Sequence, residues 1–207
     1  RINDYLSEHW SEDYVQRDLN LLREEHAADS QQGLTLPRHK TELESLTGYI
    51  SWLMDRDRKS TPLKLLQGKV WQEGYESGEL KGQVFDDVPI ALNRWRQEGK
   101  QIYIYSSGSV LAQKLLFAHT AAGDLTPLLS GYFDTAIGVK TEVGSYRRIA
   151  ARIQQPPKTI LFVSDVVTEL NAASETGMQC VLSLRAGNPP QPQHAFPTIN
   201  SFAELAF

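Results

Sequence analysis

The strongest constraint on the fold is the segment Ile-Leu-Phe-Val-Ser-Asp at residues 160–165, in which four apolar residues are followed by Ser164 and Asp165. A strand buried in a parallel sheet has such an unbroken apolar run, and ligands bind where the strands of α/β sheets end. Residues 166–173 have a helical pattern, so Asp165 and Glu169 can share one face near the start of that helix. Two carboxylates there suit a hard divalent cation, whereas the alternative role for Asp165 is that of a helix N-cap alone.

Downstream of residue 81 the sequence alternates between helical and strand patterns. Helices are expected over 88–97, 110–119, 145–153 and 166–173, and strands over 101–105, 133–137, 160–163 and 179–183. This alternation predicts an α/β fold, a doubly wound parallel sheet covered by helices. Residues 1–80 show only helical periodicity, with a loop at 31–37, and the Pro-rich residues 185–193 predict an irregular loop. We therefore expect a helical domain at 1–80 and an α/β domain at 81–207.

Composition excludes several classes of protein. The formal net charge of -4, from 21 basic and 25 acidic residues, gives no reason to expect nucleic-acid binding. No apolar run reaches the roughly 20 residues of a membrane span and no signal peptide is visible, so a cytoplasmic protein without a membrane partner is expected. The five histidines lack the His-x-x-x-His spacing that would favour zinc. The single cysteine, Cys180, excludes a disulfide framework and is interpreted as a small buried hydrophobe.

Two further segments carry residues suited to anion binding. The strand at 101–105 is followed by Ser106, Ser107, Gly108 and Ser109 before a helix, and hydroxyls with free backbone N–H groups at a helix start can bind an anion. The alternative is that Ser107 or Ser109 merely caps the helix. Lys140 lies between this segment and Asp165 in the chain, and a lone lysine is usually a solvated surface charge.

The order of these motifs resembles that of a known superfamily. A strand followed by Ser, a Lys before a helix, and a strand followed by Asp with a later carboxylate are typical of the haloacid dehalogenase superfamily. The match is closer to its enolase-phosphatase (acireductone synthase) family, a family of methionine salvage, and therefore of amino-acid biosynthesis. The matching segments are Tyr-Ile-Tyr-Ser-Ser-Gly-Ser-Val at 103–110, Gly-Tyr-Phe-Asp-Thr at 131–135, Gly-Val-Lys-Thr-Glu at 138–142, Ser-Tyr at 145–146, and the longer stretches at 57–75 and 162–173.

The resemblance implies a helical cap at 1–80 and an α/β core at 81–207 whose site residues can be named. Ser106 and Ser107 would bind the phosphoryl oxygens, and Lys140 would be both substrate-binding and catalytic. Asp165 would ligate Mg²⁺, directly or through water, and Glu169 would orient the metal-binding loop. Trp71 and Tyr75 would lie near the methylthio end of the substrate, unless they only pack the cap.

The family activity fixes the expected reaction and partners. By resemblance the substrate is 2,3-diketo-5-methylthiopentyl-1-phosphate, a small phosphorylated diketone that is enolised and then dephosphorylated to an acireductone. No nucleic-acid partner is expected, and we expect a monomer. Two alternatives remain open: a phosphatase of the same superfamily acting on another small phosphate ester, and an inactive fragment that at most binds phosphate or a partner.

The family's nucleophile motif, Asp-x-Glu-Gly-Thr, does not occur in the sequence. Residues 1–10 resemble the helix that follows this motif, so a first core strand and its loop, on the order of 20 to 30 residues, are expected to be absent before Arg1. Asp55 has an apolar segment before it, but it lies in a helical pattern and is not expected to be a nucleophile. On this interpretation the 207-residue chain would fold poorly and turn over little substrate.

Overall fold

The computed structural model describes residues 1–34, 41–58 and 60–206. The chain divides into two compact units, Arg1–Leu80 and Lys81–Phe207. No described helix has the length and apolarity that crossing a bilayer requires.

The first unit consists of helices throughout its described residues. They are α1 (Ile2–His9), α2 (Asp13–Gln31), α3 (Glu42–Asp55) and α4 (Thr61–Glu76). The start of α3 is fixed by a capping box, in which the Thr41 hydroxyl accepts from the Glu44 N–H and the Glu44 carboxylate accepts from the Thr41 N–H. The helices pack around fully buried side chains, among them Leu6, Val15, Leu19, Leu22, Tyr49, Ile50, Leu53 and Leu66. Part of the loop expected at 31–37 lies outside the described residues.

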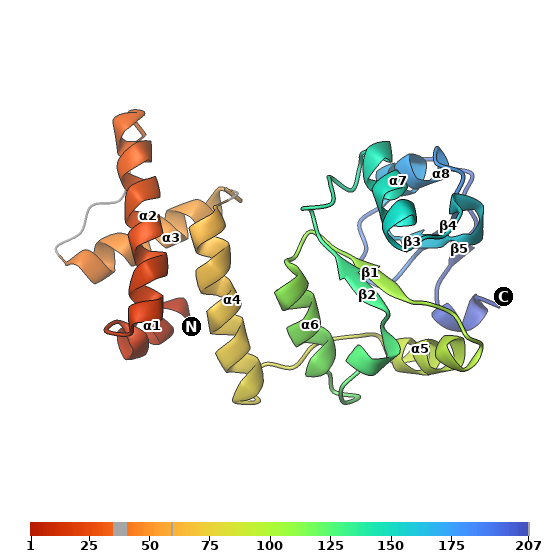
Figure 1. Ribbon diagram of the computed structural model, residues 1–207, viewed down its shortest axis with the longest axis horizontal. Helices are drawn as coiled ribbons and strands as arrows, with labels where there is room; N and C mark the ends of the chain where they lie inside the picture. Colours follow the sequence, from red (N-terminus) through yellow and green to blue (C-terminus); the bar gives the residue numbers. More distant parts are fainter. Residues whose placement is uncertain (35–40, 59, 207) are drawn as a thin grey trace. The chain divides into compact units, whose positions relative to one another are not determined.

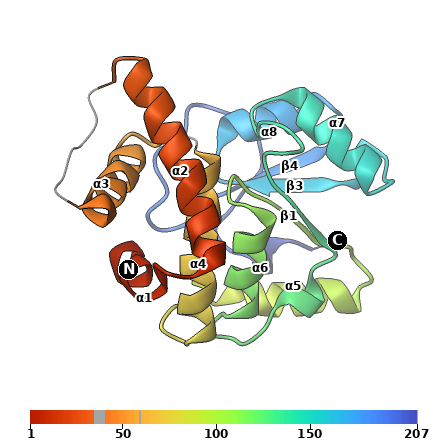
Figure 2. The same cartoon turned by 60° about the vertical axis from the view of Figure 1, so that its left-hand side comes forward.

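The second unit alternates helices and parallel strands, as expected. Its elements are α5 (Asp87–Gln97), β1 (Tyr103–Tyr105), α6 (Val110–Ala118), β2 (Gly131–Phe133), α7 (Val143–Arg152), β3 (Leu161–Ser164), α8 (Val167–Ser174), β4 (Gln179–Ser183) and β5 (Thr198–Ile199), with short 3-10 helices at Thr126–Leu128, Pro157–Thr159 and Phe202–Glu204. Helices α7 and α8 cover one face of the β3–β5 region and α5 covers the other (Figures 1 and 2). The predicted α/β fold is therefore confirmed.

The strands form two separate parallel sheets in the described residues. One sheet has the order β1-β2, with Tyr103 opposite Gly131, and the other has the order β3-β4-β5, with Leu161 opposite Gln179. The sequence predicts one doubly wound sheet, and the structure differs from this expectation because β1 and β3 are not paired.

The strand predicted at 133–137 was wrong in its boundaries. The strand expected at 133–137 is instead β2, which ends at Phe133, because Asp134 starts a turn: its carboxylate accepts from the Ala136 N–H at 2.9 Å and its carbonyl from the Ile137 N–H at 3.1 Å. Residues 185–193 contain no helix or strand, which confirms the expected irregular loop, and β5 follows them and pairs with β4 through the Ile199 carbonyl and the Leu184 N–H.

Apolar side chains fill both faces of the β3-β4-β5 sheet. One cluster includes Tyr146, Leu170, Ala173, Cys180 and Leu182, and the other includes Leu92, Trp95, Val181, Ile199 and Leu205. Successive residues of β4 thus enter opposite clusters, as the pleat of a strand requires. Cys180 is buried and burial raises the pKa of its thiol to about 11, so its interpretation as a small hydrophobe is confirmed.

Asp87 ties the C-terminal segment to the start of α5. Its carboxylate accepts hydrogen bonds from Nη1 and Nη2 of Arg185, at 3.0 and 2.7 Å, from the Ser201 hydroxyl at 2.9 Å and from the Phe202 N–H at 2.6 Å. Burial acts to raise the pKa of Asp87, but these donors outweigh it and lower the pKa from 3.8 to about 2.

We predict that Asp87→Asn lowers the free energy of unfolding by about 2 kcal/mol at pH 7. Because the folded-state pKa is depressed, the contribution is fully present above the unfolded-state value of 3.8 and is lost as the pH falls towards 2. Urea unfolding of the parent and variant at a series of pH values measures this. The exposed neighbour Asp86 provides the control Asp86→Asn, and equal stabilities of parent and Asp87→Asn at pH 7 would contradict the prediction.

Candidate functional site

The loop that carries Lys140 is held by side chains rather than by a sheet. Four consecutive carbonyl oxygens each accept a hydrogen bond from a side chain: Ile137 from Arg148 Nε, Gly138 from the Tyr105 hydroxyl at 2.8 Å, Val139 from Ser145 Oγ at 2.7 Å and Lys140 from the Tyr146 hydroxyl at 2.6 Å. Burial raises the pKa of both tyrosines, which keeps their hydroxyl groups protonated as donors. The backbone at Lys140 is therefore fixed before any ligand binds.

Gly138 is required for this arrangement. Its φ of +136° lies in a region that side-chain-bearing residues rarely adopt. A Cβ at this position would also overlap Arg148 Nη2 and Ser145 Oγ, two of the groups that hold the loop.

The Lys140 ammonium pairs with Glu169. Lys140 Nζ donates to both carboxylate oxygens of Glu169, at 3.0 and 2.8 Å, and the Ser164 hydroxyl donates to Glu169 Oε2 at 2.8 Å. Glu169 is only 8% exposed, so this charge is compensated within the protein. Both carboxylate oxygens of Glu169 accept hydrogen bonds from Lys140, so Glu169 holds the Lys140 ammonium in position.

The serines after β1 have different environments. Ser106 is half-buried and its hydroxyl accepts from the Gly108 N–H at 3.1 Å, whereas Ser107 is exposed. Ser109 is the N-cap of α6, accepting from the Ala112 N–H at 3.2 Å. The capping alternative therefore applies to Ser109 and leaves Ser106 and Ser107 for other roles.

Asp165 is exposed directly after β3. One of its oxygens accepts from the side-chain amide of Asn188. The N-cap of α8 is Val166, without a side-chain cap, so the structure does not support the alternative in which Asp165 serves only as a cap. Gln191 accepts from the Val167 N–H at 3.0 Å, so the same tail segment also covers the start of α8.

The structure brings some of the candidate residues together. Ser106 and Lys140 line one cleft of about 1040 Å³, together with Tyr105 and Tyr146; Ser107 and Asp165 do not line it. Asp165 is joined to this group through the chain, because its neighbour Ser164 bonds Glu169. Trp71, which is 40% exposed, and the half-buried Tyr75 lie on α4 in the other unit.

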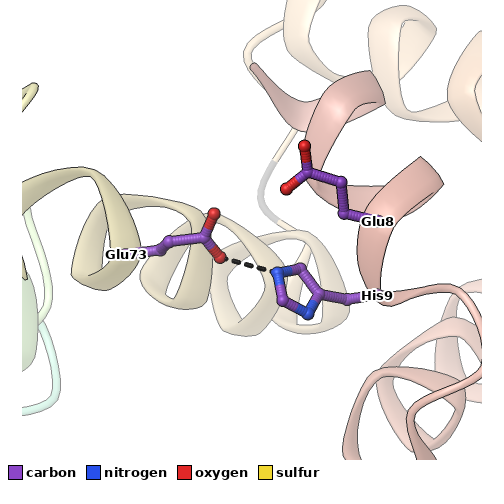
Figure 3. Close-up of side chains that lie close together, drawn as sticks. All are labelled: Glu8, His9 and Glu73. Carbon is purple, nitrogen blue, oxygen red and sulfur yellow. Dashed lines mark ion pairs between the residues drawn. The ribbon is translucent and has the colours of Figure 1, made fainter. Parts of the chain in front are cut away.

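A separate cluster of potential metal ligands lies in the first unit. Among residues 1–34, 41–58 and 60–206, three such side chains have ligand atoms within 4.8 Å of one another only at Glu8, His9 and Glu73. His9 Nε2 is 2.9 Å from Glu73 Oε2, which joins α1 to α4 (Figure 3). Asp165 is not part of this cluster. Asp55, the last residue of α3, is not part of it either.

Comparison with known proteins places this arrangement in a family. Residues 7–177 match the model of the haloacid dehalogenase-like hydrolases. The enolase-phosphatase E1 of Synechococcus elongatus is 50% identical over 206 residues, which is 99% of this chain and 86% of that protein. The enolase-phosphatase E1 of Drosophila melanogaster is 44% identical over 188 residues, 90% of this chain and 73% of that protein. The chain belongs to the enolase-phosphatase family of haloacid dehalogenase-like hydrolases.

Solved structures include proteins with a similar fold. The UTR4 protein of Saccharomyces cerevisiae has a TM-score of 0.76 at 33% identity, covering 99% of this chain and 91% of that one. A haloacid dehalogenase phosphatase from Thermococcus onnurineus, at 19% identity and a TM-score of 0.58, supports the fold alone. The family resemblance found in the sequence is thus confirmed.

Four residues that hold the candidate site could not be identified from the sequence. Tyr105 and Tyr146, which hold the Lys140 loop, look like ordinary apolar positions of a strand and a helix. Asn188 lies in the Pro-rich tail, where nothing marks it as a partner of Asp165. Asp134 lies in the segment Gly-Tyr-Phe-Asp-Thr, and its carboxylate accepts from the Val110 N–H at the start of α6, at 3.3 Å. An acidic residue directly after a strand was the one available signal for it.

Proposed function

We propose that this chain is an enolase-phosphatase, which enolises 2,3-diketo-5-methylthiopentyl-1-phosphate and dephosphorylates it to an acireductone. The observation that carries the proposal is that Lys140, whose loop accepts four hydrogen bonds from side chains, lines the same cleft as Ser106. The identity of up to 50% with relatives named enolase-phosphatase E1 supports the choice of substrate.

In this proposal the chain binds the phosphoryl group with positive charge and hydroxyl donors. The hydroxyls of Ser106 and Ser107 donate hydrogen bonds to phosphoryl oxygens, and Lys140 offsets the negative charge that spreads over them. Glu169 holds the ammonium in place through its two hydrogen bonds. Preorganised charge of this kind costs no rearrangement when substrate binds.

Asp165 is the proposed Mg²⁺ ligand. Mg²⁺ is usually bound by one or two carboxylates together with substrate phosphate oxygens and several waters, so one exposed carboxylate at a strand end fits it. When bound, the ion would supply further charge neutralisation for the phosphoryl group. Asn188 would keep the carboxylate oriented through its hydrogen bond.

We also propose that the chain by itself turns over little substrate. The sequence contains no Asp-x-Glu-Gly-Thr segment, and the residues that follow β1 and β3 are Ser106 and Asp165. The carboxylate of Asp134, after β2, already accepts from the N–H groups of Val110 and Ala136. The helical unit would act as the cap.

Binding selectivity tests the proposed function. Calorimetric titration of the 207-residue chain in the presence of Mg²⁺ should show at least tenfold tighter binding of the diketo phosphate than of any sugar phosphate in a panel. Phosphate release is measured on the same samples and should be slow. Tighter binding of a sugar phosphate would favour a phosphatase of another specificity, and no binding of any phosphate ester would refute the proposed site.

A further inference from the structure

Gln113, on α6, is a buried glutamine close to the serines that follow β1. Its side chain is only 5% exposed, and α6 packs beside β2 (Figure 1). Glutamine is mostly found at protein surfaces, because burying an amide costs free energy unless its polar atoms form hydrogen bonds. The hydrogen bonds of this amide therefore show what holds it inside the protein.

The Gln113 amide joins the serine loop (residues 106–109) to the end of β2. Its Nε2 donates to the Gly108 carbonyl at 2.9 Å and to the Phe133 carbonyl at 2.9 Å. The Phe133 carbonyl also accepts from the Ser106 N–H at 3.0 Å. One amide group thus spans the loop and the last residue of β2, so the loop cannot leave β2 without breaking these bonds.

The orientation of the Gln113 amide follows from its two partners. A carbonyl oxygen only accepts hydrogen bonds, so the amide nitrogen must face both carbonyls, and the opposite orientation would place three oxygens together. Gln113 Oε1 is buried and has no hydrogen-bond partner among the described residues. An unpaired buried acceptor is costly, so the two donated bonds, and not the oxygen, hold the side chain in this orientation.

The bond to Gly108 also sets the direction of a backbone donor in the serine loop. The peptide unit between Gly108 and Ser109 is trans, and such a unit is planar with its N–H opposite its C=O. Because the Gly108 C=O points towards Gln113, the Ser109 N–H points away from Gln113. Ser109 is exposed, and its N–H forms no hydrogen bond within the described part of the chain. The peptide unit therefore offers its N–H on this side, as anion binding requires.

A serine loop released from Gln113 would bind an anion less tightly. Without the amide, the peptide unit after Gly108 would be free to rotate and turn its C=O, the negative end of the peptide dipole, towards the ligand. Donors that are already in place cost no rearrangement when an anion binds, whereas a mobile loop must first be ordered. The hydrogen bonds of Gln113 thus favour anion binding without any contact between Gln113 and the anion.

We propose that Gln113 is a positioning residue, which clamps the serine loop to β2 in the shape that binds a phosphoryl group. It acts through the carbonyl groups of Gly108 and Phe133. The inference rests on the proposed function for the identity of the ligand, whereas the clamp is a property of the free protein. Two measurements therefore test it, one without phosphate and one with it.

Amide hydrogen exchange in the free 207-residue chain, followed by NMR, tests the clamp. Gln113→Met keeps an unbranched side chain of similar length and removes both donated bonds. The N–H groups of Ser106 and Gly108, which bond the Phe133 carbonyl and the Ser106 hydroxyl, should exchange at least fivefold faster in this variant. Gln97→Met, at the exposed end of α5, is the control and should leave both rates within twofold of the parent.

NMR titration with inorganic phosphate tests the positioning role. Gln113→Met should bind phosphate at least tenfold more weakly than the parent, and Gln97→Met should bind it within twofold of the parent. Urea unfolding of the same samples separates stability from binding, because a merely structural role would lower the free energy of unfolding and leave the phosphate affinity of the folded protein unchanged. Gln113→Asn is one methylene shorter and cannot reach both carbonyls, so it should behave like Gln113→Met and replaces it if that variant does not fold.

Two results would overturn the positioning role alone. One is unchanged exchange at Ser106 and Gly108 in a folded Gln113 variant, and the other is phosphate affinity equal to that of the parent, whether or not stability falls. A parent that binds no phosphate would refute the proposed function and the positioning role together. The affinity of the parent therefore distinguishes failure of the proposed function from failure of this inference.

Discussion

Replacing Lys140 with methionine should weaken binding of the diketo phosphate by about 100-fold. A charge-assisted hydrogen bond to a phosphoryl oxygen is about twice as strong as a neutral one, and Lys140 is placed for this role by its bonded loop and by Glu169. Methionine keeps an unbranched apolar side chain in place of the lysine stem while removing the charge. Calorimetric titration with the diketo phosphate, in the presence of Mg²⁺, measures the change.

Stability must be separated from binding in this experiment. Lys140→Met leaves the buried Glu169 carboxylate without its cation, and breaking a buried pair from one side typically costs about 3 to 5 kcal/mol. The double variant Lys140→Met with Glu169→Leu should recover much of that stability but not phosphate binding. Lys158, exposed in the same unit, provides the control Lys158→Met. Binding within threefold of the parent in Lys140→Met would contradict the proposed role.

Asp165→Asn should remove the effect of Mg²⁺ on substrate binding. Asparagine has the same shape and can still accept from Asn188, but it lacks the charge that a hard cation requires. The parent should bind the diketo phosphate at least tenfold more tightly with Mg²⁺ than without it. The variant should bind it equally in both conditions, at the affinity of the metal-free parent.

The control for this experiment is Glu175→Gln, an exposed carboxylate at the end of α8. It should leave the Mg²⁺ effect unchanged. A full Mg²⁺ effect in Asp165→Asn would show that the ion binds elsewhere.

Local patterns were sufficient to predict most elements of the second unit. Strand β4 has the predicted limits, Gln179 to Ser183. A short apolar run between turn residues is typical of a buried strand, so this strand could be predicted from its own residues. The strand that precedes Asp165 is also where the apolar run placed it. Helices α5 and α6 agree to within a residue at each end.

The contacts of the site were not predictable in the same way. Lys140 and Glu169 are separated by 29 residues and Asp165 and Asn188 by 23, so their pairing depends on the packed fold rather than on local spacing. Asp165 and Glu169, expected to act together at one helix face, have different partners. The division of the sheet depends likewise on which strands pair, a tertiary property that no single segment encodes.

The most direct test of the account is a crystal structure of the 207-residue chain with Mg²⁺ and a phosphonate analogue of the diketo phosphate. We predict phosphonate oxygens within hydrogen-bond distance of the hydroxyls of Ser106 and Ser107 and of Lys140 Nζ, with the metal on Asp165. A phosphonate bound away from these residues, or a metal at Glu8, His9 and Glu73 instead of Asp165, would contradict it.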